Sequence, residues 1–238
     1  MSTHLLLINP NTSPEVTADV AESARRVVSP GTVVTAVNPE HGPAVIDGAY
    51  DKALATYGLV EEMQRAEREE DYDAYVIACF GDPGLDAAKE LTDKPVVGIA
   101  EAAIMVSAFL GARFSIVSTL PRAQERLRRL AELNGAGARL ASVRTTDLGV
   151  LAFHEDPEGT LDVLEAAGAE AIREDGAEVL VLGCAGMTGL AGRLSERLGV
   201  PVVDPVEAAS RVAESLVALR YSTSKANTYQ APTEKVYR

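Results

Sequence analysis

The sequence predicts an α/β fold of two similar Rossmann-like lobes, each a parallel sheet flanked by helices, related by a pseudo-twofold axis. Two observations lead to this prediction. Short apolar runs alternate with longer segments such as EVTADVAESARRVV and EGTLDVLEAAGAEAIRE, in which apolar residues recur every three or four positions. The chain also contains an internal repeat. Strands that are apolar throughout belong to parallel sheets covered on both faces.

Eight short segments are expected to form strands. In chain order they read HLLLIN, TVVTAV, DAYVIAC, PVVGIA, RFSIVS, RLASV, EVLVLGC and PVVD. The segment EHGPAVIDGAY (40–50) contains Gly and Pro and predicts a long loop that can close over a ligand. Residues 223–238 lose the apolar period, so we expect a tail that is either disordered or docked on the body or on a neighbouring subunit.

The internal repeat pairs the two halves of the chain element by element. KPVVGIAEAA (94–103) matches VPVVDPVEAA (200–209), and LLLINPNTSPE (5–15) matches FSIVSTLPRAQ (114–124) as strand, polar corner, proline and helix. Short segments that are common in α/β proteins can be alike by chance, but elements that agree in order and spacing favour a true repeat. The predicted division is residues 1–98 plus 205–222 for lobe 1, 99–204 for lobe 2 and 223–238 for the tail.

Composition excludes several classes of partner. The formal net charge of −13 disfavours nucleic acid and anionic membranes, which both need basic patches. HLLLI is too short for a signal peptide, and no apolar run approaches the ~18 residues of a membrane span, so we expect a cytoplasmic protein. Three scattered histidines and the absence of a CxxC motif give no metal site.

The two cysteines of the chain occupy the same kind of corner. Cys79 and Cys184 each follow an apolar run at a predicted strand-to-helix turn, and Gly81 and Gly186 follow them. Parallel sheets bind ligands beyond the carboxyl ends of their strands. Helix N-termini stabilise a thiolate, so we expect both cysteine pKa values to fall below ~8.5. A lone cysteine is more often an apolar filler, but this pair favours two thiols that flank one small molecule in the interlobe cleft.

Six motifs carry a family resemblance. They are INPNTS (8–13), ACFGDPGL (78–85), GIAEAA (98–103), STLPR (118–122), LGCAGM (182–187) and TSKANTYQAP (223–232). With them the sequence resembles the aspartate/glutamate racemase superfamily, within it the hydantoin racemases, which include allantoin racemases. The resemblance implies cofactor-independent racemisation by Cys79 and Cys184, one on each face of the substrate. It also implies a homo-oligomer, a tetramer or hexamer, and no Gly-rich nucleotide fingerprint contradicts the expectation of no cofactor.

The residues after each cysteine differ from those of the amino-acid racemases, which typically carry CNT and CTH. Here Phe80 and Gly81 follow the first cysteine, and Ala185 and Gly186 follow the second. An aromatic ring and backbone amides suit a neutral planar ring with carbonyl acceptors. We therefore expect a small-molecule substrate of the 5-substituted hydantoin type, with allantoin favoured by the overall wording of the motifs.

The expected chemistry is two-base proton transfer at C5 of the ring. A thiolate removes the proton at one face, and a thiol returns one at the other. Backbone N–H groups at 80–82 and 185–187 are expected to stabilise the enolate oxygen. Asn11 and Thr119 can hydrogen-bond the ring amides, although turn or capping duty explains them equally well. Glu101 and Glu207 are expected to be structural or interlobe residues.

Three alternatives stay open at this point. They are an aspartate or glutamate racemase, a related cysteine isomerase or decarboxylase, and a non-catalytic binding protein for small molecules. Single-cysteine chemistry fits poorly because both cysteines are present. A pure binding protein has no need of two activated thiols.

Overall fold

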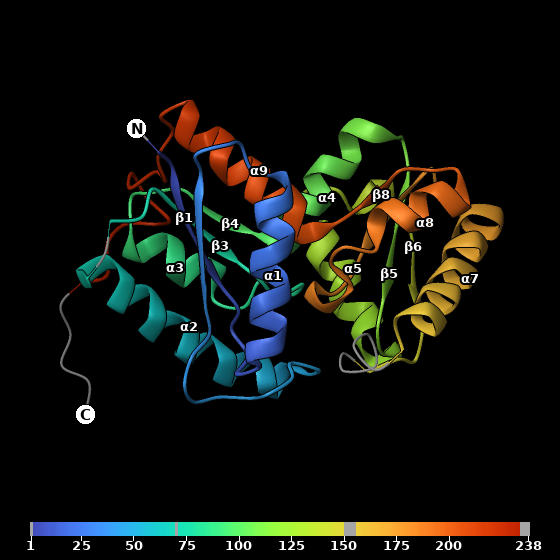
Figure 1. Cartoon of the computed structure of the whole chain (residues 1–238), viewed down its shortest axis with the longest axis horizontal. Helices are drawn as coiled ribbons and strands as arrows, with labels where there is room; N and C mark the ends of the chain where they lie inside the picture. Colours follow the sequence, from blue (N-terminus) through green and yellow to red (C-terminus); the bar gives the residue numbers. More distant parts are fainter. Residues whose placement is uncertain (1, 70, 150–155, 234–238) are drawn as a thin grey trace.

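Two parallel sheets form the framework of the molecule (Figure 1). The computed structural model describes residues 2–69, 71–149 and 156–233. The first four-stranded sheet has the order β2-β1-β3-β4, with β1 (His4–Ile8), β2 (Val33–Val37), β3 (Ala74–Ile77) and β4 (Val96–Gly98). The second has the order β6-β5-β7-β8, with β5 (Phe114–Ser118), β6 (Leu140–Thr145), β7 (Val179–Leu182) and β8 (Val202–Val203). Every expected strand is present, and the predicted α/β class with two parallel sheets is confirmed.

Helices flank both sheets. They are α1 (Pro14–Val27), α2 (Ala49–Glu69), α3 (Leu85–Leu91), α4 (Ile99–Leu110), α5 (Gln124–Leu133), α7 (Pro157–Asp175), α8 (Ala191–Leu198) and α9 (Pro205–Ala218), with short 3₁₀ turns η1 (Pro121–Ala123), η2 (Gly137–Arg139) and η3 (Ala185–Met187). No helix within the described ranges is both long and apolar enough to span a bilayer.

Local sequence explains where the helices next to the cleft begin. Ser13 caps α1 by accepting the N–H of Val16, and Pro14 occupies the first turn. Asp204 caps α9 in the same way, again with a proline, Pro205, in the first turn. A cap of this kind stabilises a helix by about 1 kcal/mol, and proline at the first position has its backbone angle already set.

The two sheets repeat the same register at the ends of their central strands. Beyond β3, the N–H of Ala78 donates to Ile8 O of β1 at 2.8 Å. Beyond β7, the N–H of Gly183 donates to Val117 O of β5 at 2.7 Å. The residue that follows each of these donors is a cysteine. Matching backbone bonds therefore bring each cysteine to the carboxyl edge of its sheet.

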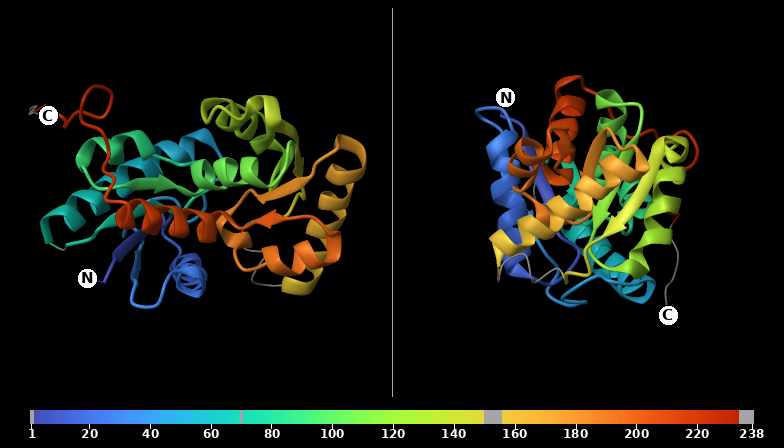
Figure 2. Two further views of the ribbon diagram at one scale, coloured as in Figure 1. Left: turned by 90° about the horizontal axis from the view of Figure 1, so that it is seen from above. Right: turned by 90° about the vertical axis from the view of Figure 1, so that its right-hand side faces the viewer.

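Helices α4 and α9 cross between the sheets (Figure 2). Helix α4 directly follows β4 of the first sheet but packs on β7 and β8 of the second, whereas α9 follows β8 and packs on β1, β3 and β4. The two helices also pack on each other, and one apolar core cluster contains side chains from both sheets. The chain crosses from one sheet to the other close to residues 98 and 204, where the sequence predicts the lobe boundaries. The division into lobes itself stays a prediction.

Two irregular segments were predicted in outline. The loop expected over 40–50 is present, but α2 begins at Ala49, so the last two residues of the expected loop are helical. The tail is docked on α3 where it is described. The ammonium of Lys225 donates to Lys89 O at 2.6 Å, and the hydroxyl of Tyr229 donates to the Asp86 carboxylate at 3.2 Å. Residues 234–238 of the predicted tail lie outside the described residues.

Candidate active site

One pocket between the carboxyl edges of the two sheets contains both cysteines. Each cysteine lies two residues beyond the end of its strand, β3 or β7, and neither forms a disulfide. The catalytic and substrate-binding residues proposed from the sequence line the pocket: Asn11, Cys79, Phe80, Gly81, Thr119, Cys184, Ala185 and Gly186. Asp82 and Met187, whose N–H groups were also expected to bind the enolate, are not among the lining residues. The structure thus brings together residues from four strand-to-helix corners.

The first cysteine corner is a tight turn tied to helix α4. The N–H groups of Gly81 and Asp82 donate to Cys79 O at 2.8 and 3.0 Å. Asp82 has a φ of 42°, and its buried carboxylate accepts the N–H groups of Ala100 and Glu101 at the start of α4. Gly98 is needed here because a Cβ on it would lie 2.3 Å from the Asp82 carboxyl carbon. This corner is therefore anchored by a carboxylate that reaches out of it.

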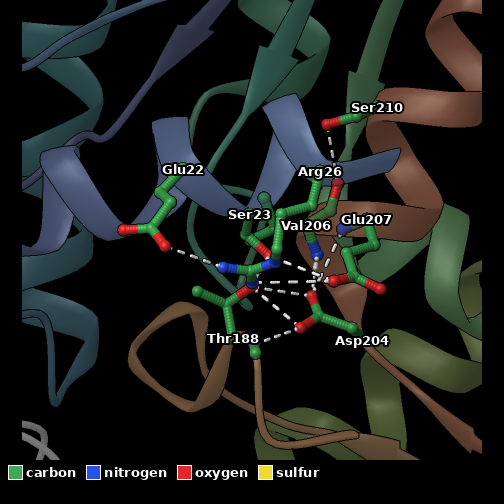
Figure 3. Close-up of polar contacts among 9 residues, drawn as sticks. Glu22, Ser23, Arg26, Thr188, Asp204, Val206, Glu207 and Ser210 are labelled. Atoms are coloured by element: carbon green, nitrogen blue, oxygen red, sulfur yellow. Dashed lines mark hydrogen bonds and ion pairs between the residues drawn. The ribbon is translucent and has the colours of Figure 1, made fainter. Parts of the chain in front are cut away.

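The second cysteine corner is anchored in the opposite direction (Figure 3). The N–H of Met187 donates to Cys184 O at 3.1 Å. Further along the turn, the hydroxyl of Thr188 donates to the Asp204 carboxylate at 2.8 Å and the N–H of Gly189 donates to it at 2.7 Å. The same carboxylate caps α9. Here the carboxylate belongs to the helix start and reaches into the cysteine corner.

The prediction that helix termini lower the cysteine pKa values is wrong. Burial raises the pKa of Cys79 to about 12, and the neighbouring Cys184 and Asp82 add to this rise. Burial raises the pKa of Cys184 to about 11, while the N–H groups of Gly186 and Met187 act in the opposite, expected direction. Helix α3 begins only at Leu85, too far along the chain for its N-terminus to offset the loss of water around Cys79.

Asn11 and Thr119 combine local and pocket-facing roles. The side-chain oxygen of Asn11 accepts the N–H of Ser13 at 2.9 Å and the amide of the buried Asn9 at 2.7 Å. Thr119 supports its turn through its backbone carbonyl, which accepts the N–H of Asp147 at 3.1 Å. The Asn11 NH₂ and the Thr119 hydroxyl have no hydrogen-bond partner within the described part of the chain. Both groups are free to bind a ligand.

Two cations line the pocket that the sequence analysis did not single out. The ammonium of Lys52, on α2, donates to Gly81 O at 2.5 Å in the first cysteine corner. Arg126, on α5, donates from Nη1 to Asp47 O at 3.3 Å in the loop before α2. Val45 and Ile46 of that loop also line the pocket, and closure of the loop over a ligand stays a prediction.

The two repeated glutamates form ion pairs at the edge of the site. Glu101 accepts from the ammonium of Lys89 at 2.8 Å, and Glu207 lies 3.7 Å from the guanidinium of Arg26. Neither glutamate lines the cysteine pocket. Across residues 2–69, 71–149 and 156–233 no group of three or more potential metal ligands is found.

Solved structures identify the class of fold. The structure aligns with a glutamate racemase from Bacillus anthracis at a TM-score of 0.66 and 17% identity, covering 92% of this chain and 82% of the other. It aligns far more closely with an allantoin racemase from Klebsiella pneumoniae, at a TM-score of 0.96 and 40% identity over 100% of this chain and 96% of the other. The fold is thus that of the two-lobed racemases.

Sequence comparison identifies the family. The family model described as Asp/Glu/Hydantoin racemase matches residues 5–213. A hydantoin racemase from Paenarthrobacter aurescens is 63% identical over 98% of this chain and 99% of its own length, and one from Rhizobium meliloti is 45% identical over 98% and 96%. The chain belongs to the Asp/Glu/hydantoin racemase family, and the prediction of a racemase enzyme is confirmed at this level.

Proposed function

We propose that the protein interconverts the enantiomers of 5-substituted hydantoins by two-base proton transfer at C5, with Cys79 and Cys184 as the two bases. The observation that carries this proposal is the placement of two free thiols at matching corners of one pocket. A planar ring held between them presents one face to each sulfur. The hydantoin racemase of P. aurescens, at 63% identity, supports the choice of ring.

The ionisation of the two thiols supports a division of labour between base and acid. Ionised Cys184 raises the pKa of Cys79, so the state with one thiolate and one thiol is favoured over two thiolates. The thiolate takes the C5 proton, and the electron pair of the C–H bond delocalises onto the neighbouring carbonyl oxygen. The thiol on the opposite face then returns a proton to C5.

Hydrogen-bond donors around the pocket suit the carbonyl oxygens of the ring. Of the backbone amides expected to bind the enolate, Gly81, Asp82 and Met187 already donate to cysteine carbonyls. The N–H groups of Phe80 and Ala185 have no acceptor in the described part of the chain. With the side chains of Asn11 and Thr119, they are the groups that we assign to ring recognition.

The lining favours an apolar 5-substituent. Apolar side chains from three segments border the pocket: Val16, Val45, Ile46, Phe80 and Pro83. A ureido group, as in allantoin, loses hydrogen bonds to water against such a surface. The motif wording favoured allantoin, but this lining leads us to place alkyl- and arylmethyl-hydantoins first. Allantoin is the second candidate, supported by the structural likeness to the K. pneumoniae enzyme.

A panel of optically pure substrates tests the proposal. It contains 5-benzylhydantoin, 5-isopropylhydantoin, allantoin, L-aspartate and L-glutamate, and the readout is loss of optical rotation. We expect racemisation of the first two to be fastest, abolished by iodoacetamide and unchanged by exhaustive EDTA treatment without added pyridoxal phosphate. Racemisation of the amino acids alone, or no activity on any hydantoin, contradicts the proposal.

The proposal extends to the state of the protein in the cell. We include in it a homo-oligomer, a tetramer or hexamer, and a cytoplasmic location, both expected from the sequence. Light scattering of the purified protein measures the first. A monomeric mass across the concentration range of the activity assay contradicts it.

A further inference from the structure

Arg126 has an unused donor next to the two cysteines. It lies on α5, packed beside the second sheet, and it lines the same pocket as Cys79 and Cys184. Its Nη1 donates to Asp47 O of the loop before α2. Its Nε is fully buried and has no hydrogen-bond partner. No other buried side-chain nitrogen or oxygen of the described residues lacks one. Arg126 thus contributes a positive charge to the lining of the pocket, and its buried Nε–H has no acceptor among the described residues.

An unsatisfied donor of this kind needs an explanation. A buried polar group without a partner costs about 1–3 kcal/mol, and more when it is charged. No carboxylate in the described ranges forms an ion pair with Arg126. Packing alone does not account for it, because an apolar side chain fills such a place without the cost. A ligand oxygen that becomes negatively charged beside the guanidinium does account for a cation at this place.

We propose that Arg126 is a catalytic residue that binds the oxygen on which negative charge develops when the ring loses its C5 proton. The inference rests on the proposed function. As the C5–H bond breaks, the proton goes to sulfur and the electron pair moves through C5–C4 to the carbonyl oxygen. The guanidinium of Arg126 donates to that oxygen, and the bond strengthens as the charge forms. When the second thiol protonates C5, the electron pair returns and the oxygen becomes a neutral carbonyl.

The surrounding contacts support a charged donor at this place. Three of the six backbone amides next to the cysteines donate to the cysteine carbonyls, and the Gly186 N–H is directed to the Cys184 sulfur. The corner amides alone thus offer few donors for an enolate. Lys52, the other cation of the lining, already donates to Gly81 O. We assign it the role of a positioning residue that fixes the first cysteine corner.

A second role for Arg126 must be separated from this one. Its positive charge acts to lower the pKa of Cys79, whereas no such effect is found for Cys184. If stabilisation of the Cys79 thiolate is its only role, Arg126 matters for proton removal by Cys79 and not for removal by Cys184. If it binds the enolate oxygen, it matters for both, because both routes pass through the same enolate.

The test combines Arg126→Gln with each cysteine variant. Cys79→Ser and Cys184→Ser each leave one thiol, and exchange of C5–H for deuterium in D₂O reports the remaining one. We expect Arg126→Gln to slow exchange by a similar factor in both backgrounds. With both cysteines present it should lower kcat by about 10²–10³-fold, with KM changed less than threefold. The exposed Arg128→Gln on the same helix is the matched control and should leave all rates within twofold.

Several results overturn the inference. They are a kcat within threefold of the unmodified protein, a loss of exchange only where Cys79 is the remaining thiol, or a loss carried by KM alone, which marks a loop anchor. If Arg126→Gln does not fold, Arg126→Lys replaces it: lysine keeps the charge but lacks the planar guanidinium and its N–H groups, and a loss of about tenfold or more in kcat is expected. If the unmodified protein racemises no hydantoin, the proposed function fails instead.

Discussion

The two cysteine corners use the same bridge built from opposite ends. In each, a carboxylate joins the cysteine turn to the N-terminus of a crossing helix. Asp82 belongs to the first turn and reaches α4, whereas Asp204 belongs to the start of α9 and reaches the second turn. Gly98 stands where the repeat has Asp204, which leaves room for the Asp82 carboxylate. Both halves of the repeat therefore contain a carboxylate link between the cysteine turn and the helix, but the aspartate that forms this link occupies a different position in each half.

The charges around the two sulfurs differ as well. Cys79 faces the cations Arg126 and Lys52, which oppose the effect of burial on its pKa. Burial also raises the pKa of Cys184; the backbone N–H groups of its own turn oppose this rise, and Asp47 adds to it. The first thiol is therefore tuned by side chains from distant elements, and the second mainly by local backbone.

The largest expected effect comes from removing either thiol. Cys79→Ser and Cys184→Ser should each lower racemisation by about 10³-fold or more, because a serine hydroxyl is a very weak acid and base at neutral pH. In D₂O each variant should still exchange C5–H of one enantiomer with retention, and the two should prefer opposite enantiomers. NMR loss of the C5–H signal measures this, after subtraction of spontaneous exchange. If both variants exchange the same enantiomer, the proposal that each cysteine acts on one face of the substrate is contradicted.

The next largest effect is the pH dependence of catalysis. With thiol pKa values of about 12 and 11, only a small fraction of either cysteine is ionised at neutral pH. Since the proposed reaction needs one thiolate and one thiol, kcat/KM should rise about tenfold per pH unit from pH 6 to pH 8.5. Initial rates of racemisation, corrected for the spontaneous reaction at each pH, test this. If kcat/KM instead reaches a plateau below pH 8, one thiol of the free protein has a lowered pKa, as the effect of a helix N-terminus alone predicts.

The smallest effect concerns stability at the first bridge. Burial raises the pKa of Asp82 to about 7, although the N–H groups of Glu101 and Ala100 oppose the rise. A carboxyl whose pKa is raised on folding stabilises the fold below its unfolded value of about 3.9, and this contribution is lost as pH rises through 7. The contribution amounts to at most about 4 kcal/mol.

Asp82→Asn cannot ionise and isolates that contribution. We compare the free energy of unfolding of this variant with that of the unmodified protein at pH 4 and at pH 8. The difference, variant minus unmodified protein, should be more positive at pH 8, and urea denaturation at both pH values measures it. The exposed Asp93→Asn serves as the control. A difference between Asp82→Asn and the unmodified protein that does not vary with pH contradicts the raised pKa.

Much of the fold was predictable because its signals are local or repeated. Strands such as β7 are apolar throughout, helices α1 and α9 begin at a capping residue followed by proline, and the repeat aligned Cys79 with Cys184. The same repeat marked Asn11 and Thr119, and both line the pocket. Sequence reasoning succeeded wherever a residue's place follows from its own strand or turn.

The remainder depends on contacts between distant segments. Arg126 lies in an amphipathic helix among several arginines, and nothing in its neighbourhood separates it from Arg128 or Arg129. Lys52 reaches Gly81 only because α2 packs beside the first cysteine corner. The thiol pKa values follow from burial by both halves at once. None of these has a motif or a period that a single sequence displays.

The unequal charges at the two corners meet a thermodynamic constraint when the substrate has a single stereocentre. Enantiomers have equal free energy in water, so the equilibrium constant of their interconversion is one. It follows that kcat/KM for the two directions must be equal in this protein and in any variant of it. The asymmetry between Cys79 and Cys184 is therefore invisible in that ratio. In the steady-state kinetics of racemisation it can appear only as compensating differences in kcat and KM, with the enantiomer bound more tightly also turned over more slowly.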